Sequence, residues 1–193
     1  MPAHRVHFKH GYALLRELGL DPIGSRVRSV DRLIDFPRQY AREYLKAMET
    51  REEVRGCIEE KFDDPEIIYF LPAFSHDMRT QRYSPKRTDW SRTMISVLRR
   101  LIDCVHGEGY GLLADLHALL DMAEKWCCDD RLLEEWARDV GLDPRVLEYY
   151  TRHREAIDRD LGCTERKRQG RCGLRNAARA LREQAREGGE DEP

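Results

Sequence analysis

Two apolar stripes within residues 90–126, WSRTMISVLRRLIDCVHGEGYGLLADLHALLDMAEKW, decide the fold of this chain. The apolar residues in each half recur every three or four positions, which places them on one face of an α-helix. Gly107 and Gly109 lie between the two stripes and favour a turn. The segment therefore predicts two helices, 90–105 and 112–126, packed antiparallel as a hairpin.

Shorter helical patterns flank this hairpin on both sides. We predict helices over residues 12–18, 29–36, 37–58 with a turn near residue 50, 131–140, 144–160 and 173–187. Ile67–Leu71 is the clearest strand candidate. We expect it either to pair with Val6–Phe8 as an edge ribbon or to be buried coil. The predicted fold class is all-α: a helical bundle with a helix-turn-helix-like corner and at most a minor β element.

The length of 193 residues fits one to one and a half domains. We predict a small N-terminal helical lobe over residues 1–75 and a helical domain over residues 76–187. The last residues, 188–193, read GGEDEP and are expected to form a disordered acidic tail.

Charged residues make up 36% of the chain, yet the net charge is only −2. Two basic segments, 77–100 and 162–182, are offset by an acidic one, 115–135. The basic segments could contact nucleic acid, or they could pair with the acidic segment. No run approaches the ~18 apolar residues that span a bilayer, and MPAHRVHFKH lacks the apolar core of a secretory signal. We therefore expect no membrane partner and a cytoplasmic location.

The six cysteines also favour a cytoplasmic location. Cys57 and Cys104 fall on the apolar faces of predicted helices, where a free thiol is an ordinary core residue. This usage favours a reducing compartment. A zinc site is conceivable for Cys127, Cys128, Cys163 and Cys172. Their spacing matches no regular zinc pattern, so we assign no metal and no cofactor to them.

One corner carries a recognisable pattern. Ala137 is followed by Gly141 four residues later and by Leu147 six residues beyond that. The small residue lets two helices touch, the glycine permits the turn, and the leucine packs the second helix back. This pattern resembles the helix-turn-helix DNA-binding motif over residues 132–157. The resemblance implies that the second helix, beginning at Pro144, enters a major groove.

The resemblance also implies which side chains would contact DNA. Arg145, Tyr149 and Arg152 would face outward and contribute base readout. Phosphates would be neutralised by cations of the basic C-terminal segment, namely Arg166, Lys167, Arg168, Arg175 and Arg179. We therefore expect non-catalytic nucleic-acid binding, with DNA as the first candidate. The alternative is a helical interaction or assembly module that binds a protein partner or a second copy of the chain.

The same corner pattern occurs twice, as LRELGLDP at residues 15–22 and as ARDVGLDP at residues 137–144. In both, we expect the glycine to take the left-handed cap position and the following leucine to pack back on the ending helix. The aspartate is expected to cap the next helix, with proline at its first position.

Arg100 and His106 have the spacing R-x5-H at a helix end. This resembles the catalytic motif of HEPN-type ribonucleases, in which dimers pair two such motifs to act on an RNA 2′-hydroxyl and phosphate. The other interpretation is a surface arginine and a histidine placed where a helix C-terminus favours positive charge. We assign no catalytic residue, and the enzyme remains the second alternative.

Two groups of residues offer metal ligands. His4, His7 and His10 are spaced by three, and His117 and Asp121 lie one helical turn apart. We expect the N-terminus to be extended or frayed. His117 and Asp121 are expected to meet solvent or to form a salt bridge beside the leucine stripe. The sequence therefore leads us to assign no metal site.

Overall fold

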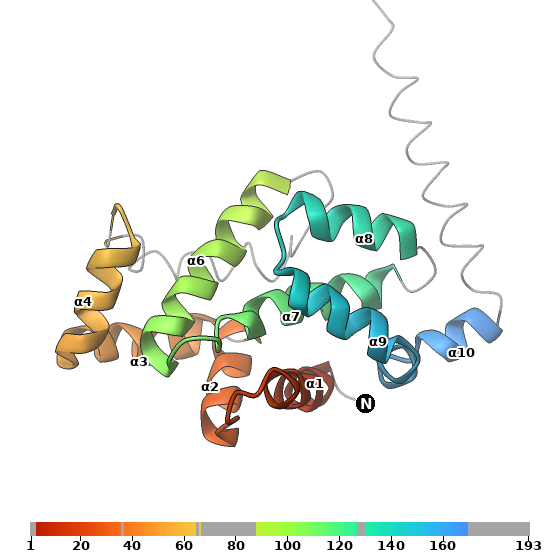
Figure 1. Ribbon diagram of the computed structural model, residues 1–193, viewed down its shortest axis with the longest axis horizontal. Helices are drawn as coiled ribbons and strands as arrows, with labels where there is room; N and C mark the ends of the chain where they lie inside the picture. Colours follow the sequence, from red (N-terminus) through yellow and green to blue (C-terminus); the bar gives the residue numbers. More distant parts are fainter. Residues whose placement is uncertain (1–2, 36, 65, 67–87, 127–129, 170–193) are drawn as a thin grey trace, which may run out of the picture.

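The computed structural model describes residues 3–35, 37–64, 66, 88–126 and 130–169. Helices account for 83% of these residues, which contain no strand, so the all-α class is confirmed. None of the described helices is long and apolar enough to cross a bilayer. The helices, labelled as in Figure 1, are α1 (Ala3–Glu17), α2 (Gly24–Asp35), α3 (Pro37–Thr50), α4 (Glu52–Lys61), α6 (Thr88–His106), α7 (Leu112–Lys125), α8 (Asp130–Asp139), α9 (Pro144–Asp160) and α10 (Cys163–Arg168).

Helix α7 is the centre of the bundle, with α1, α2, α6, α8 and α9 packed around it (Figure 1). Every residue from Leu112 to Ala123 is buried. A helix that is covered on all sides needs apolar residues on all its faces, and most of these positions are Leu, Ala or Met. Asp115, His117 and Asp121 are buried along with them. Burial requires these three polar side chains to find partners inside the protein.

Helix α6 carries the apolar stripe predicted for residues 90–105. Its buried residues include Met94, Leu98 and Leu101, which recur at helical spacing. The helix ends before Gly107 and Gly109, which have φ angles of +105° and +90°, a region that glycine reaches without steric cost. Because α7 begins three residues after Gly109, the prediction of two helices joined by a glycine turn is confirmed.

The N-terminal region differs from the prediction. Helix α1 starts at Ala3, whereas the sequence predicted a helix only over residues 12–18 and an extended Val6–Phe8. The possible ribbon pairing of Val6–Phe8 is therefore wrong. Val6 and Leu14 are fully buried in one hydrophobic cluster with α7, α8 and α9, and this tertiary packing extends the helix. Ile67–Leu71, the strand candidate, lies outside the described residues.

Helices before and after residue 75 share their hydrophobic cores. One cluster joins Val6 and Leu14 to residues of α6 to α9. The other joins Leu15 of α1 and residues of α2 to α4 to the apolar face of α6 and the start of α7. The residues around the predicted boundary, 67–87, lie outside the described part, so the division into a lobe and a domain stays a prediction.

The two similar corners share their glycine caps. Gly19 and Gly141 have φ angles of +72° and +70°. The leucine that follows each glycine donates its N–H to a carbonyl five residues earlier, at 3.0 Å in both corners. The corners differ after that point, because α2 begins at Gly24 and not at Pro22 as predicted. There the Tyr110 hydroxyl accepts the Ile23 N–H at 2.8 Å, which satisfies that group without an aspartate cap.

The cysteines also differ from the prediction. Cys57 of α4 and Cys104 of α6 form a disulfide, with their Cα atoms 5.6 Å apart. Cys163 is disulfide-bonded as well. The expectation of free thiols at Cys57 and Cys104 is therefore wrong, since the packing of α4 on α6 brings two apolar faces and their cysteines together. Cys127, Cys128 and Cys172 lie outside the described residues.

Candidate functional site

The corner between α8 and α9 has the geometry that the sequence predicts. Ala137 is fully buried, and Gly141 has a positive φ. Asp143 is the N-cap of α9, and its side chain accepts the Arg145 N–H at 2.9 Å. Pro144 occupies the first position of the helix, where its missing N–H costs nothing.

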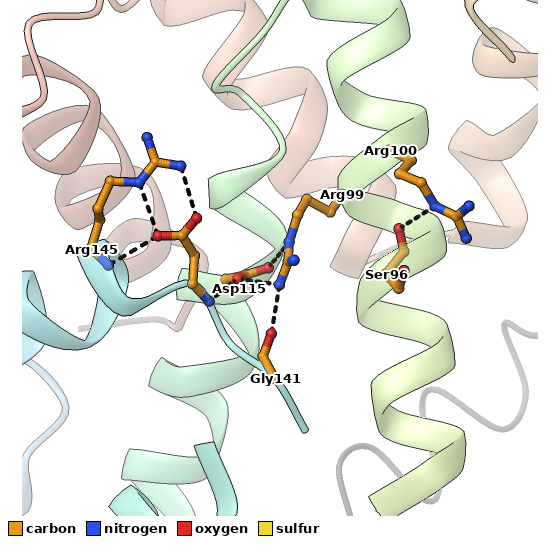
Figure 2. A network of polar contacts seen from close by, with 7 residues as sticks. Ser96, Arg99, Arg100, Asp115, Gly141 and Arg145 are labelled. Atoms are coloured by element: carbon orange, nitrogen blue, oxygen red, sulfur yellow. Dashed lines mark hydrogen bonds and ion pairs between the residues drawn. The ribbon is translucent and has the colours of Figure 1, made fainter. Parts of the chain in front are cut away.

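A buried carboxylate pins this corner to the rest of the bundle. Asp115 of α7 accepts two hydrogen bonds from the Arg99 guanidinium, at 2.8 and 2.6 Å, and a third from the Asp143 N–H at 2.6 Å (Figure 2). Arg99 also donates to the Gly141 carbonyl at 3.0 Å. Burial raises the pKa of Asp115 to about 6, against the opposing effect of Arg99. The network fixes the α8–α9 corner on α6 and α7.

The residues predicted to read bases have different fates. Tyr149 is only 2% exposed, and its hydroxyl lies 3.0 Å from Nδ1 of His10. The prediction that Tyr149 faces outward is therefore wrong, because α1 packs against this side of α9. Arg145 and Arg152 are exposed, but Arg145 forms an ion pair with Asp143 and Arg152 with Glu17, at 2.8 and 3.0 Å.

The described part of the basic C-terminal segment is engaged within the protein. Arg166 donates to the Glu124 carbonyl at 3.0 Å and to the Leu161 carbonyl at 3.1 Å. Lys167 forms a 2.6 Å ion pair with Asp158. Arg168 pairs with a glutamate of its own helix at 2.9 Å. The other two predicted phosphate contacts, Arg175 and Arg179, lie outside the described residues.

The structure does not join Arg100 and His106 in a common site. Arg100 donates to the Lys61 carbonyl at 2.7 Å, and its guanidinium lies 4.4 Å from the ring centroid of Phe62. Figure 2 shows its side chain on the opposite flank of α6 from Asp115. His106 instead lies 2.8 Å from the Tyr44 hydroxyl. Burial, together with nearby arginines, lowers the pKa of His106 to about 4.

A different group of side chains meets in the interior, where α1, α2 and α7 pack together. His7 comes from α1, Asp31 from α2 and His117 from α7, and their potential ligand atoms all lie within 4.8 Å of one another. Asp121, one turn after His117, lies on the other side of the rings. The two histidine side chains are 3–4% exposed, so the cluster is screened from solvent.

The imidazole rings of His7 and His117 lie against each other, with their centroids 3.7 Å apart. On one edge, Oδ1 of Asp31 lies 3.8 Å from Nδ1 of His7 and 3.9 Å from Nε2 of His117. On the opposite edge, Asp121 lies 3.4 Å from Nε2 of His7 and 3.8 Å from Nδ1 of His117. Each ring therefore stands between two carboxylates.

On the Asp31 edge, the separations of 3.8 and 3.9 Å favour a shared ion over direct hydrogen bonds. Hydrogen bonds of this kind measure about 2.7–3.2 Å. Two ligands of one tetrahedral ion, each about 2.1 Å from the metal, lie about 3.4 Å apart. Imidazole nitrogen and carboxylate oxygen are the ligands that zinc and non-haem iron take. A shift of about half an ångström would bring the two separations from Asp31 to the value for ligands of one ion.

A small cavity lies at the same place. It has a volume of about 10 Å³ and is lined by His7, Asp31 and His117, with Gly11 and aliphatic side chains forming its other walls. This volume admits about one water-sized sphere. The space therefore suits a single ion and is too small for an organic substrate.

Reasoning from the sequence missed this cluster because it treated α7 as a helix with one solvated side. The solvent alternative for His117 and Asp121 is wrong, whereas the salt-bridge alternative agrees with their ion pair at 3.8 Å. An extended N-terminus around His7 is wrong. The signal was available in Ala114 and Ala118, which are apolar residues off the predicted stripe. They indicate a helix that is buried all round. Asp31 gave no comparable signal.

Comparisons with known proteins give no match to a family model, to a curated protein or to a solved structure.

Proposed function

We propose that this protein binds one divalent transition-metal ion through His7, Asp31 and His117, and that the ion fastens α1 to α2 and α7. The observation that supports this function is the convergence of three ligand atoms, from three helices, beside one buried cavity. Two imidazoles and one carboxylate form a ligand set for iron or zinc. Three protein ligands are one fewer than a closed structural site has, so a water molecule or a further group of the protein must fill the fourth position. Because the cavity has no room for an organic substrate, we infer a structural role for the ion.

The ligands are far apart in the chain, so the complete site exists only in the folded protein. Metal binding then adds directly to the free energy of unfolding. At a free-ion concentration 100 times the Kd, the gain is about 2.7 kcal/mol. For a chain of this size, a gain of that order raises the Tm by about 5–10 °C.

The test uses the full chain, freed of metal with a chelator and then titrated with Zn²⁺ or Co²⁺. We expect one ion per chain by elemental analysis and a rise in the Tm measured by circular dichroism. Asp31→Asn and His117→Gln each remove one ligand, and we expect each to weaken binding by about 100-fold or more.

His10→Gln is the matched control. His10 is also a buried histidine of α1, but its nitrogens lie 3.0 Å from the Tyr149 hydroxyl and 2.9 Å from Asp160. This variant should lose stability and still bind the ion with unchanged affinity. Equal ion binding by the wild-type chain and by His117→Gln would contradict the proposal.

Nucleic-acid binding is a second candidate, supported by one observation. The α8–α9 corner combines a left-handed glycine with a capped second helix, as the motif requires. The side chains of Arg145 and Arg152 are 56% and 61% exposed. Surface ion pairs contribute little, so both arginines are free to exchange their carboxylates for phosphates. The pairs formed by Arg166 and Lys167, and the burial of Tyr149, leave fewer contacts than the sequence predicted.

Binding of a labelled DNA duplex, measured by fluorescence anisotropy at low and high salt, tests this candidate. Arg145→Ala with Arg152→Ala should weaken binding, and affinity should fall steeply with salt. Arg131→Ala is the control, because Arg131 lies on α8 with an 88% exposed side chain and pairs with Glu135. An equal loss in the control would show non-specific attraction and would remove the role of the corner.

Two further expectations from the sequence remain proposals. A helical assembly module would give a defined oligomer or partner complex in light scattering, without nucleic acid. The expected cytoplasmic location depends in part on reduced thiols, and the Cys57–Cys104 disulfide argues against that part of the reasoning. Alkylation of the protein inside intact cells, followed by mass spectrometry, measures which state the two cysteines have.

A further inference from the structure

The two carboxylates of the histidine cluster are not equivalent. A single oxygen of Asp31, Oδ1, faces one nitrogen of each ring, at 3.8 and 3.9 Å. Asp121 divides its oxygens instead, with Oδ1 3.4 Å from His7 and Oδ2 3.8 Å from His117. On the Asp31 edge, one oxygen and two nitrogens face a common point, as the ligands of a single ion do. On the Asp121 edge, each nitrogen has an oxygen of its own, as two separate N–H donors require.

The cavity distinguishes the two edges in the same way. Its lining includes Asp31 together with both histidines, and it does not include Asp121. The space for an ion therefore lies on the Asp31 edge of the rings. The ligating nitrogens are then Nδ1 of His7 and Nε2 of His117, which are the atoms that face Asp31.

This choice of nitrogens fixes where the protons must be. A neutral imidazole that binds a metal through one nitrogen carries its proton on the other. His7 must then be protonated on Nε2 and His117 on Nδ1, so the two rings need opposite tautomers. Both of these nitrogens face Asp121, one toward each carboxylate oxygen, at 3.4 and 3.8 Å. These separations have to shorten by about 0.2–0.6 Å to become hydrogen bonds when the ion is bound. A ligating histidine almost always donates its second N–H to such an acceptor.

We propose that Asp121 is a positioning residue of the metal site: it accepts both N–H groups and so selects the tautomers in which His7 and His117 bind the ion that Asp31 completes. This inference rests on the proposed metal-binding function. Asp31 is then a ligand of the ion, and Asp121 is an acceptor for the two histidines. The residue types alone would make the two aspartates equal candidates for ligands.

Asp121→Asn is the informative substitution, because it preserves the shape of the side chain and changes its hydrogen bonding. The amide offers one oxygen acceptor, and its nitrogen can only donate toward the second ring. One histidine is then driven to the wrong tautomer, with its proton on the ligating nitrogen. We expect the affinity for Co²⁺ to fall by about 10–100-fold. The visible spectrum of bound Co²⁺ should keep its shape, because the ligands are the same.

Two further variants control this result. Asp31→Asn should change the Co²⁺ spectrum as well as the affinity, because it alters a ligand. Asp115→Asn replaces another buried aspartate of α7, and this residue bonds Arg99 and not the histidines. It should alter stability without altering Co²⁺ affinity. Asp121→Glu, which retains two acceptor oxygens, should restore part of the affinity.

A direct measurement does not depend on any variant. Long-range ¹H–¹⁵N NMR of the Zn²⁺-loaded wild-type chain reports the protonated nitrogen of each histidine. The expected result is Nε2–H for His7 and Nδ1–H for His117, with one ion per chain. The same tautomer for both rings, or two ions per chain, would overturn the assignment of Asp121, as would a Co²⁺ spectrum altered by Asp121→Asn.

The failures of the two proposals are distinguishable. Absence of Co²⁺ and Zn²⁺ binding by the wild-type chain refutes the proposed function and this inference with it. Normal binding by the wild-type chain together with unchanged affinity in Asp121→Asn refutes the inference alone.

Discussion

Gly111, where the turn after α6 meets the start of α7, gives the sharpest test of the packing. Its φ of −59° and ψ of −26° suit any residue, so alanine adds no backbone strain there. An added Cβ would lie 2.4 Å from the carbonyl oxygen of Arg99 and 2.9 Å from Cγ of Asp103. The Arg99 oxygen belongs to the backbone of α6, so Gly111→Ala must move one helix relative to the other.

The size of the effect follows from this overlap. Ordinary van der Waals contacts begin at 3.4 Å, so the Cβ is a full ångström too close to the Arg99 oxygen. Overpacking of this kind costs about 1–3 kcal/mol and sometimes more. We expect Gly111→Ala to lower the free energy of unfolding by about 3 kcal/mol and the Tm by about 6–12 °C. Urea unfolding followed by circular dichroism measures the change.

Alanine substitutions at two other glycines serve as controls, because they change the backbone preference without creating a close contact. Gly141 has a φ of +70° and open space around it, so Gly141→Ala should cost only the left-handed strain of about 1–2 kcal/mol. Gly56 lies within α4, also in open space, and Gly56→Ala should stabilise the protein by about 0.5–1 kcal/mol. Wild-type stability in Gly111→Ala would refute the close approach of α6 and α7.

Three further substitutions test other parts of the fold. Because the pKa of His106 is lowered from 6.5 to about 4, the unfolded chain takes up the proton first, and stability should fall by up to about 3 kcal/mol between pH 6.5 and 4. His106→Gln should flatten this dependence in urea unfolding at the two pH values. Asp143→Ala removes the cap of α9 and should cost about 1 kcal/mol in a thermal melt. Cys57→Ser opens the disulfide that joins positions 47 residues apart, and should cost about 2–4 kcal/mol. Added reductant should remove the difference between Cys57→Ser and the wild type.

Local signals in the sequence predicted most helix ends. Gly107 ends α6, Pro37 begins α3, and Gly141 with Pro144 shapes the α8–α9 corner. Glycine and proline act through their own backbone preferences, and these do not depend on contacts with distant parts of the chain. The same reasoning failed at Pro22, because a hydrogen bond to Tyr110 from another part of the chain replaces the local cap.

The candidate site was not predictable in this way, because it depends on which helices lie side by side. His7, Asp31 and His117 are far apart in sequence and meet only through the packing of α1 and α2 on α7. Tyr149 shows the same dependence in reverse. Its helical position suggested an outward face, but α1 covers that side of α9. An apolar pattern can indicate that a helix is buried on all sides, as Ala114 and Ala118 do for α7, but it does not identify which helices are its neighbours.

The enclosure of α7 sets the pattern of substitutions that the chain can accept. A surface helix tolerates replacements on its solvated side, so tolerance rises and falls with the helical repeat. Helix α7 has no such side between Leu112 and Ala123. In a saturation-mutagenesis library, we therefore expect all twelve consecutive positions to reject polar substitutions. Tolerance should not vary with the 3.6-residue period that an amphipathic helix shows.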